Sequence, residues 1–469
     1  MIELLGMCGF EPDEAKSELP RMERAFKKVG ITTEDIEQAK QRLNLYYDME
    51  LKGVRKIFRL CIHEMTNSIL AREEGKSKVV FGFMSPGLEV LGSALMSKSR
   101  DVFFAHQSWA IMAILGCVFG KFVPILEAAE TLWLKSGVVS HCANVKSLLG
   151  LITLDILPKP DLLLTTGFSC ETAPKTIDLL HELYDIPVCC YDTCQDREFA
   201  DYSVSSIRTV GLAAKSLRSA AKRIGKTAGF GITDEMIFKA LKTKHPFNVA
   251  LEKLFGLIEK SDPMPISSTH QTLFMVLASL TMSIEKLPEA VDAVNTLHEE
   301  LQVRIDKGQG SVPKGAPRVL AILPCHHSDP RLEHLAGEMG IALISTDIGF
   351  ELPFPQKPKD SYEMSSLHLQ QSLATSLSGR IQLIVKGCRD LKIDGVLNRY
   401  HVGCRAVAGD SLIITDRVSK ELGIPALLLE WENFDPRAYN QEEYRKHLEL
   451  FKILMQNSKS KYPGSASGL

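Results

Sequence analysis

The sequence contains eleven cysteines, and several follow predicted strands, where thiolates would suit a soft metal. Cys170 follows the apolar run DLLLTTGFS, and Cys404 follows GVLNRYHVG. Because ligands of open parallel sheets bind at the carboxyl ends of the strands, both thiols are expected to face one crevice. Cys142 begins HCANVKSLLG, which predicts a helix N-terminus, where the helix dipole favours a thiolate.

Spacing alone leaves two interpretations of these three cysteines open. Three thiolates from two domains would suit a cluster or a metal with an open coordination position. Alternatively, each is a small buried hydrophobe, since free cysteine is among the most buried residue types. The sequence has no compact CxxC pair that would decide between them.

The remaining cysteines fall into two groups. Those at strand ends are Cys189, Cys190 and Cys194 in PVCCYDTC and Cys325 in ILPCHHSDP. They are either additional metal ligands or part of strand ends that happen to be rich in thiols. Those in helical or apolar contexts, which we expect in the core, are Cys8, Cys61, Cys117 and Cys388.

Two adjacent histidines, His326 and His327, follow Cys325, with Asp329 and His334 nearby. Such a set suggests a zinc site with mixed nitrogen and sulfur ligands, and hence a zinc-dependent hydrolase. Adjacent loop histidines usually point in different directions, which favours ordinary polar loop residues. Either histidine could instead donate a proton at the crevice, since its ordinary pKa suits a general acid.

Other polar residues adjoin the predicted site. Glu89 opens a predicted helix, where it either acts as an acid near a substrate or complements the helix dipole. His141, Ser169 and Arg405 adjoin the three cysteines and could tune a cluster or bind a substrate oxygen. Glu89, Ser169, His326 and His327 are therefore the catalytic candidates.

The elements that must position these residues alternate between strand and helix. Short apolar runs such as KVVFGFM and RVLAILP recur in two separate blocks, which predicts an α/β fold with two similar open parallel sheets, Rossmann or flavodoxin-like. The expected divisions are a helical segment over 1–75, an α/β domain over 76–205, a helical connecting block over 206–305, a second α/β domain over 306–460 and a disordered tail over 461–469. Glu430, Glu432, Asp435 and Arg437 follow the last predicted strand and are interpreted as a salt-bridged turn.

Composition excludes several classes of partner. The 55 Lys and Arg nearly balance the 57 Asp and Glu, so no net field favours nucleic acid or an anionic membrane. The longest uncharged stretch, from Val102 to Gly120, is too short for a spanning helix, and the N-terminus lacks the pattern of a signal peptide. A cytoplasmic protein with reduced thiols is expected.

Nucleotide-binding motifs are also missing from the sequence. AAKRIGKT lacks the leading glycine of a phosphate-binding loop and lies in a helical pattern, and no GxGxxG follows a strand. We expect that this chain binds neither ATP nor a nicotinamide.

Five segments resemble the 2-hydroxyacyl-CoA dehydratase and benzoyl-CoA reductase family, from about Lys78 to Met455. They are SPGLEVLGSAL, AAETLWLKSGVVSHCANVKSLLG, PDLLLTTGFSCETAPKTIDLLHE, LRSAAKRIGKTAGFGITDEMIFKAL and DGVLNRYHVGCRAVAGDSLIITDRVSKELGIPALLLEWENFDPRAY. The resemblance implies that Cys142, Cys170 and Cys404 hold a 4Fe-4S cluster whose fourth iron position is open to water, hydroxyl or a thioester carbonyl. Only this resemblance indicates that Cys142 is a cluster ligand in the same way as Cys170 and Cys404.

The resemblance also implies partners and a reaction class. Family members dehydrate 2-hydroxyacyl-CoA thioesters by injecting one electron so that hydroxide is expelled, reduce aryl-CoA thioesters, or reduce small molecules at a double-cubane cluster of eight irons. Their electrons come from a separate ATP-hydrolysing iron-sulfur activator. A homodimer or a heterodimer with a related subunit is expected. CCYDTC and Cys325 depart from ordinary dehydratase subunits and would supply the extra ligands of a double cubane. An electron-transfer or cluster-carrier protein without its own substrate site is the alternative from another class.

Overall fold

Two four-stranded parallel sheets, each covered by helices, form the framework of the protein. The computed structural model describes residues 1–83, 89–106, 109–136, 142–167, 170, 172–192, 207–280, 286–322, 328–348, 358–372, 374–401, 403–432 and 434–461, without the side chains of 89, 133–136, 405, 406 and 459–461. The strands are β1 (Lys78–Phe83), β2 (Val102–His106), β3 (Leu162–Thr166), β4 (Val188–Tyr191), β5 (Arg318–Ile322), β6 (Ala342–Thr346), β7 (Gly395–Tyr400) and β8 (Ala426–Glu430).

The two sheets have the same topology. The first sheet has the order β2-β1-β3-β4 and the second sheet has the order β6-β5-β7-β8, with every pair parallel. In both sheets the first strand of the block is central and the chain moves outward to either side. The carboxyl ends of all four strands therefore lie along one edge of each sheet.

The helices fall into three groups along the chain. Those before or within the first α/β block are α1 (Ile2–Met7), α2 (Pro12–Lys28), α3 (Thr33–Tyr46), α4 (Lys52–Leu70), α5 (Glu89–Lys98), α6 (Trp109–Met112), η1 (Ala113–Val118), α7 (Val123–Ser136), α8 (Ala143–Thr153) and α9 (Thr172–Tyr184). The helical block comprises α10 (Ile207–Ala228), α11 (Asp234–Lys260), α12 (His270–Ser279) and α13 (Leu287–Asp306). The remainder are α14 (Arg331–Glu338), α15 (Ser361–His368), α16 (Leu377–Asp390), α17 (Arg405–Leu422), η4 (Pro436–Ala438) and α18 (Gln441–Lys461).

The first sheet is buried on both faces, as expected for continuous apolar strands with crossover helices. On one face Phe104 and Leu164 belong to a cluster with Leu217 of α10 and Ile237 of α11. The opposite face packs in the largest core cluster, with helices that include α4, α8 and α9.

The second sheet is likewise covered on both faces, by α14 and α18 on one side and by α16 and α17 on the other. Its central strand β7 carries two buried polar residues. Asn398 Nδ2 donates to Thr415 Oγ1 at 2.8 Å, and Arg399 Nη1 donates to Glu333 Oε1 at 2.8 Å. Because buried polar groups must find partners, these contacts fix α17 and α14 on opposite sides of the strand.

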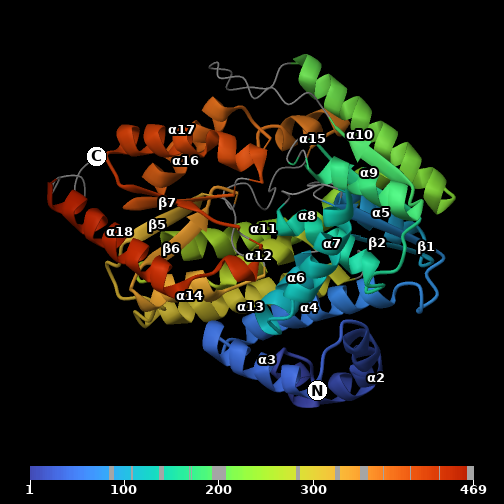
Figure 1. Ribbon diagram of the computed structural model, residues 1–469, viewed down its shortest axis with the longest axis horizontal. Coiled ribbons are helices and arrows are strands. Elements are labelled where there is room, and N and C mark those ends of the chain that lie inside the picture. The colour runs from blue at the N-terminus through green and yellow to red at the C-terminus, as the bar shows by residue number, and fades with distance from the viewer. Residues whose placement is uncertain are drawn as a thin grey trace.

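The helical block separates the two sheets. In Figure 1 the first sheet lies on the right and the second on the left, with α11 and α12 between them and α13 and α4 below. Helix α10 contacts α15 of the second half. The molecule therefore holds the two sheets in a fixed relation through helices from both halves.

The strands predicted from apolar runs such as KVVFGFM, DLLLTT, RVLAILP and GVLNRY are confirmed, as is the mainly helical block between the two sets of strands. The α/β class is therefore confirmed, whereas the expected domain boundaries stay predictions. The expected disordered tail lies, except for residue 461, outside the described residues. Among the helices that the structure describes, none is both long and apolar enough to cross a bilayer.

Candidate functional site

Each of the three cysteines expected to bind a cluster lies at the start of a helix. Cys142 is the N-cap residue of α8 and Cys404 is the N-cap residue of α17. Cys170 lies two residues before α9, where its Sγ is 3.2 Å from Thr172 Oγ1. Helix N-termini carry unpaired amides and a partial positive charge, so all three positions favour an anionic group.

The structure brings these three thiols together although they come from different halves of the chain. Burial raises the pKa of Cys142 well above its ordinary value, and Glu432, Cys170 and Cys404 raise it further. Burial likewise raises the pKa of Cys404 to about 12, and Cys170 adds to this shift. Charges act on one another mainly at short range, so these mutual effects indicate that the three cysteines lie near one another.

Glu432, which follows β8, links the two sides of this site. Its Oε1 accepts a hydrogen bond of 3.2 Å from the amide of Ala143 and one of 3.3 Å from the amide of Phe434. Its Oε2 lies 2.7 Å from Nε2 of His401, whose carbonyl accepts the amide of Cys404 at 2.9 Å. One carboxylate therefore ties the backbone beside Cys142 to the loop that carries Cys404.

The sequence predicted a salt-bridged turn that includes Glu432. It did not predict that Glu432 would link the backbone beside Cys142 to the loop that carries Cys404. The turn is confirmed for Asp435, which lies 2.7 Å from Arg437, and Arg437 also pairs with Glu130 at 2.6 Å. A usable signal was nevertheless present, because Glu432 follows a strand end just as Cys170 and Cys404 do.

A buried arginine completes the surroundings of Cys404. Arg380 lies in the first turns of α16 and is only 2% exposed. Its guanidinium pairs with Asp347, which follows β6, at 2.8 Å, and it lowers the pKa of Cys404. The site therefore contains a fixed positive group as well as the Glu432 carboxylate.

Comparison with known proteins identifies the family of this chain. The sequence profile of the 2-hydroxyglutaryl-CoA dehydratase D-component matches residues 111–452. The chain belongs to this family. The matched residues include all three cysteines and Glu432, and the family expected from the sequence is confirmed.

Two relatives illustrate the breadth of this dehydratase family. The alpha subunit of the (R)-2-hydroxyglutaryl-CoA dehydratase of Acidaminococcus fermentans is 20% identical over 295 residues, which cover 62% of this chain and 60% of that subunit. A subunit of the benzoyl-CoA reductase of Thauera aromatica is 21% identical over 325 residues, which cover 65% of this chain and 72% of that protein. The chain thus aligns with only part of each relative.

The donor set of the site fits the iron-sulfur cluster that the dehydratase family implies. Within the described residues, no three His, Cys, Asp or Glu side chains come close enough to hold a single metal ion. A 4Fe-4S cubane binds each thiolate at a separate iron, so its ligands stand further apart than those of one ion. Three neighbouring thiols, of which Cys142 and Cys170 are buried and Cys404 is half-buried, are compatible with that requirement.

Cys189 and Cys190, which the sequence left open as either extra ligands or part of a thiol-rich strand end, lie inside β4. They therefore point to opposite faces of the first sheet. Cys189 packs on the α10 face, where burial raises its pKa and Arg223 lowers it. Cys190, by contrast, is exposed to solvent. The structure does not bring these two thiols to one point.

Several other candidates cannot be placed. Cys194, Cys325, His326, His327, Ser169 and His141 lie outside the described residues, as do the side chains of Glu89 and Arg405. Of the zinc set, Asp329 pairs with Arg331 at 2.7 Å and His334 lies 3.5 Å from Glu338. Cys8, Cys61, Cys117 and Cys388 are buried, as expected for core residues.

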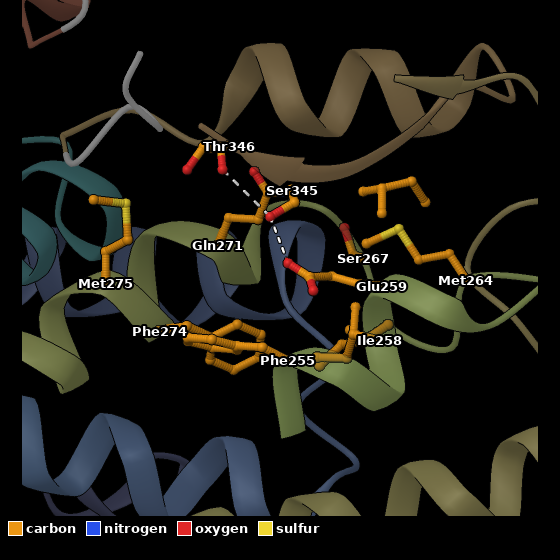
Figure 2. Close-up of a pocket in the computed structure, with 12 residues that line it drawn as sticks. Phe255, Ile258, Glu259, Met264, Ser267, Gln271, Phe274, Met275, Ser345 and Thr346 are labelled. Atoms are coloured by element: carbon orange, nitrogen blue, oxygen red, sulfur yellow. Dashed lines mark hydrogen bonds between the residues drawn. The ribbon is translucent and has the colours of Figure 1, made fainter. Parts of the chain in front are cut away.

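A separate small cavity lies between the helical block and the edge strand β6 (Figure 2). It has a volume of about 40 Å³ and mostly apolar walls, including Phe255 and Phe274. Glu259 Oε1 accepts a hydrogen bond of 2.6 Å from Ser345 Oγ there, and burial raises the pKa of Glu259 to about 7. This carboxyl is therefore partly protonated at neutral pH.

Proposed function

We propose that this chain is the cluster-bearing catalytic component of a 2-hydroxyacyl-CoA dehydratase or aryl-CoA reductase type of enzyme. Cys142, Cys170 and Cys404 would hold one 4Fe-4S cluster, which supplies low-potential electrons when bound. The observation that carries the proposal is that these thiols, from both halves of the chain, influence one another, since Cys170 raises the pKa of both Cys142 and Cys404. Membership of the dehydratase family supports the reaction class.

The residues around the cysteines suit an anionic cluster. Each ligand stands at a helix N-terminus, where the dipole stabilises negative charge. Glu432 adds a negative charge beside Cys142, and burial limits solvent access; both favour a low reduction potential. The chain's own contribution is to bind the cluster, orient it and exclude water.

The remaining parts of the system are proposed from the family. The electrons come from an ATP-hydrolysing iron-sulfur activator, and the substrate is a CoA thioester held at or near the open iron. Both relatives are named as subunits, which supports a homodimer or a heterodimer with a related chain. We further propose two flavodoxin-like domains and a cytoplasmic location. His326, His327, Ser169 and Glu89 remain the catalytic candidates for proton transfer.

Loss of individual thiols tests the assignment. Cys142→Ser, Cys170→Ser and Cys404→Ser should each remove most of the iron, the acid-labile sulfide and the visible absorbance from protein prepared without oxygen. Cys388→Ser is the matched control, because Cys388 is a buried thiol in the second half of the chain, and it should keep the full cluster. Full iron content in Cys404→Ser would contradict the proposal.

A double-cubane reductase of small molecules is the second candidate, favoured by the thiol-rich CCYDTC segment. The opposite directions of Cys189 and Cys190 weigh against their joint use as ligands. About four irons per chain would support a single cubane, and about eight a double one. Turnover of acyl-CoA thioesters in the presence of activator would separate either enzyme from an electron carrier.

A further inference from the structure

Arg380 is a buried cation that Asp347 and Ser372 hold in one orientation. Asp347 Oδ2 accepts from both Nε and Nη2 of Arg380, at 3.1 and 2.8 Å. Ser372 Oγ donates to the same oxygen at 2.8 Å and accepts from Arg380 Nε at 3.2 Å. The side chains of Arg380 and Asp347 are 2% and 0% exposed, so the guanidinium has almost no freedom to turn.

The third nitrogen of this guanidinium makes no hydrogen bond within the described residues. Nη1 of Arg380 is buried, and no group in the described part of the chain accepts a hydrogen bond from it. Because an unpartnered charged donor is costly in a protein interior, native structures rarely keep one without a use. The hydrogen bonds to Asp347 and Ser372 use Nε and Nη2 of the guanidinium and leave Nη1 available.

The sheet topology places the Arg380 guanidinium at the same edge of the second sheet as Cys404. The guanidinium lies close enough to Cys404 to lower the pKa of its thiol. Asp347 follows β6 and Cys404 follows β7, so both belong to the carboxyl edge of the second sheet, where ligands of open parallel sheets bind.

We propose that Nη1 of Arg380 binds the carbonyl oxygen of the acyl thioester in the cysteine site. This inference rests on the proposed function, since it needs a thioester beside the cluster. The Arg380–Asp347 pair is neutral overall, so it does not hold a free anion strongly. Instead it offers a fixed donor to an oxygen that becomes negative.

The chemistry gives this donor a role beyond binding. A cluster held by Cys142, Cys170 and Cys404 would donate one electron to the thioester, losing that electron itself, and the added negative charge would reside mainly on the carbonyl oxygen. A prearranged N–H at that oxygen stabilises the charge without any rearrangement of the protein. Lysine cannot replace arginine here, because a single ammonium cannot both pair with Asp347 and keep the guanidinium geometry.

Comparing each thioester with its thioether analogue isolates the contribution of the contact between Arg380 and the carbonyl oxygen. We would measure the dissociation constants of benzoyl-CoA, 2-hydroxyglutaryl-CoA and their thioether analogues, in which CH₂ replaces the carbonyl, for the cluster-loaded protein. In wild-type protein the thioesters should bind more tightly than the thioethers. Arg380→Lys should reduce that preference about tenfold or more, because it removes a hydrogen bond from a charged donor.

Arg399→Lys is the matched control variant. Arg399 is equally buried and pairs with Glu333 at 2.8 Å on the α14 side of the second sheet, so its loss should leave the preference unchanged. Ser372→Ala is a milder second variant in case Arg380→Lys folds poorly. It removes the hydrogen bond between Ser372 Oγ and Arg380 Nε. We expect the preference for thioesters over thioethers to fall about threefold.

The outcomes separate this inference from the proposed function. If cluster-loaded wild-type protein binds neither thioester, or the chain holds no cluster, the proposed function fails. If wild-type protein prefers the thioesters but Arg380→Lys and Ser372→Ala keep that preference, the role of Arg380 alone is overturned. Equal losses in Arg380→Lys and Arg399→Lys would also overturn it, since the effect would then be structural.

Discussion

The carboxylate of Glu432 accepts a hydrogen bond of 3.2 Å from the amide of Ala143, a residue 289 positions earlier in the chain. Ala143 follows Cys142 and begins α8. Glu432 also lies 2.7 Å from His401, in the loop before Cys404. The placement of one proposed cluster ligand relative to another therefore depends on a single side chain at the end of β8.

Glu432→Ala should weaken both the fold and the binding of the cluster. The substitution leaves the buried amide of Ala143 without its acceptor, which typically costs about 1–3 kcal/mol. We expect the free energy of unfolding in urea to fall by about that amount and the iron content to fall with it. Glu432→Gln keeps an acceptor oxygen and should lose less of both. Wild-type stability and iron content in Glu432→Ala would refute the linking role.

Assembly of the cluster should depend steeply on pH. Burial raises the pKa of Cys142 and that of Cys404, the latter to about 12, so both thiols are protonated at neutral pH in the cluster-free chain. Iron binds thiolates, so ligation releases these protons. Each released proton should strengthen apparent iron binding up to tenfold per pH unit. Anaerobic iron uptake between pH 6.5 and 8.5 measures the slope, and a flat profile would contradict it.

Helix α8 packs so closely against the start of α7 that adding one methyl group at Gly150 should lower the stability of the fold. A Cβ at Gly150 would lie 2.0 Å from the carbonyl oxygen of Ile125, so Gly150→Ala forces the helix away from α7. Overpacking of this kind costs about 1–3 kcal/mol, and α8 carries Cys142 at its N-cap. Thermal unfolding should show a lower midpoint, and the iron content should fall.

Gly256→Ala is the matched control for that substitution. Gly256 lies inside α11, and a Cβ there would meet nothing within 4 Å. Alanine should therefore stabilise the helix by about 0.5–1 kcal/mol and leave the iron content unchanged. A loss of iron in both variants would show that the effect does not come from the position of α8.

The apolar strands and the strand-end cysteines were predictable because each depends on local sequence. Runs such as KVVFGF and GVLNRY indicate buried parallel strands, and their order places Cys170 and Cys404 at strand ends. The contact between Glu432 and Ala143 was not predictable, because it depends on how two separate sheets face each other. Arg380 lies in a helix whose pattern gives no sign that its charge is buried. Its pairing with Asp347 is a tertiary contact.

The buried carboxyl of Glu259 (Figure 2) leads to a separate prediction about how the stability of the fold depends on pH. Burial raises its pKa from 4.5 to about 7, so the folded chain holds this proton at pH values where the unfolded chain has lost it. Stability should therefore fall as the pH rises from about 4.5 to about 7, then level off, by up to about 3 kcal/mol. Glu259→Gln removes the ionisation while keeping an acceptor for Ser345 Oγ.

Glu259→Gln should therefore match the wild type near pH 5 and exceed its unfolding free energy above pH 7, by up to about 3 kcal/mol. Urea unfolding of both proteins at pH 5, 6, 7 and 8 isolates the difference. Glu64→Gln provides a calibration, because burial alone raises the pKa of Glu64 to about 8. Its stability difference should begin at the same pH but keep growing until about one pH unit higher. A difference between Glu259→Gln and wild type that stays constant across this range would show that Glu259 does not ionise at the higher pKa.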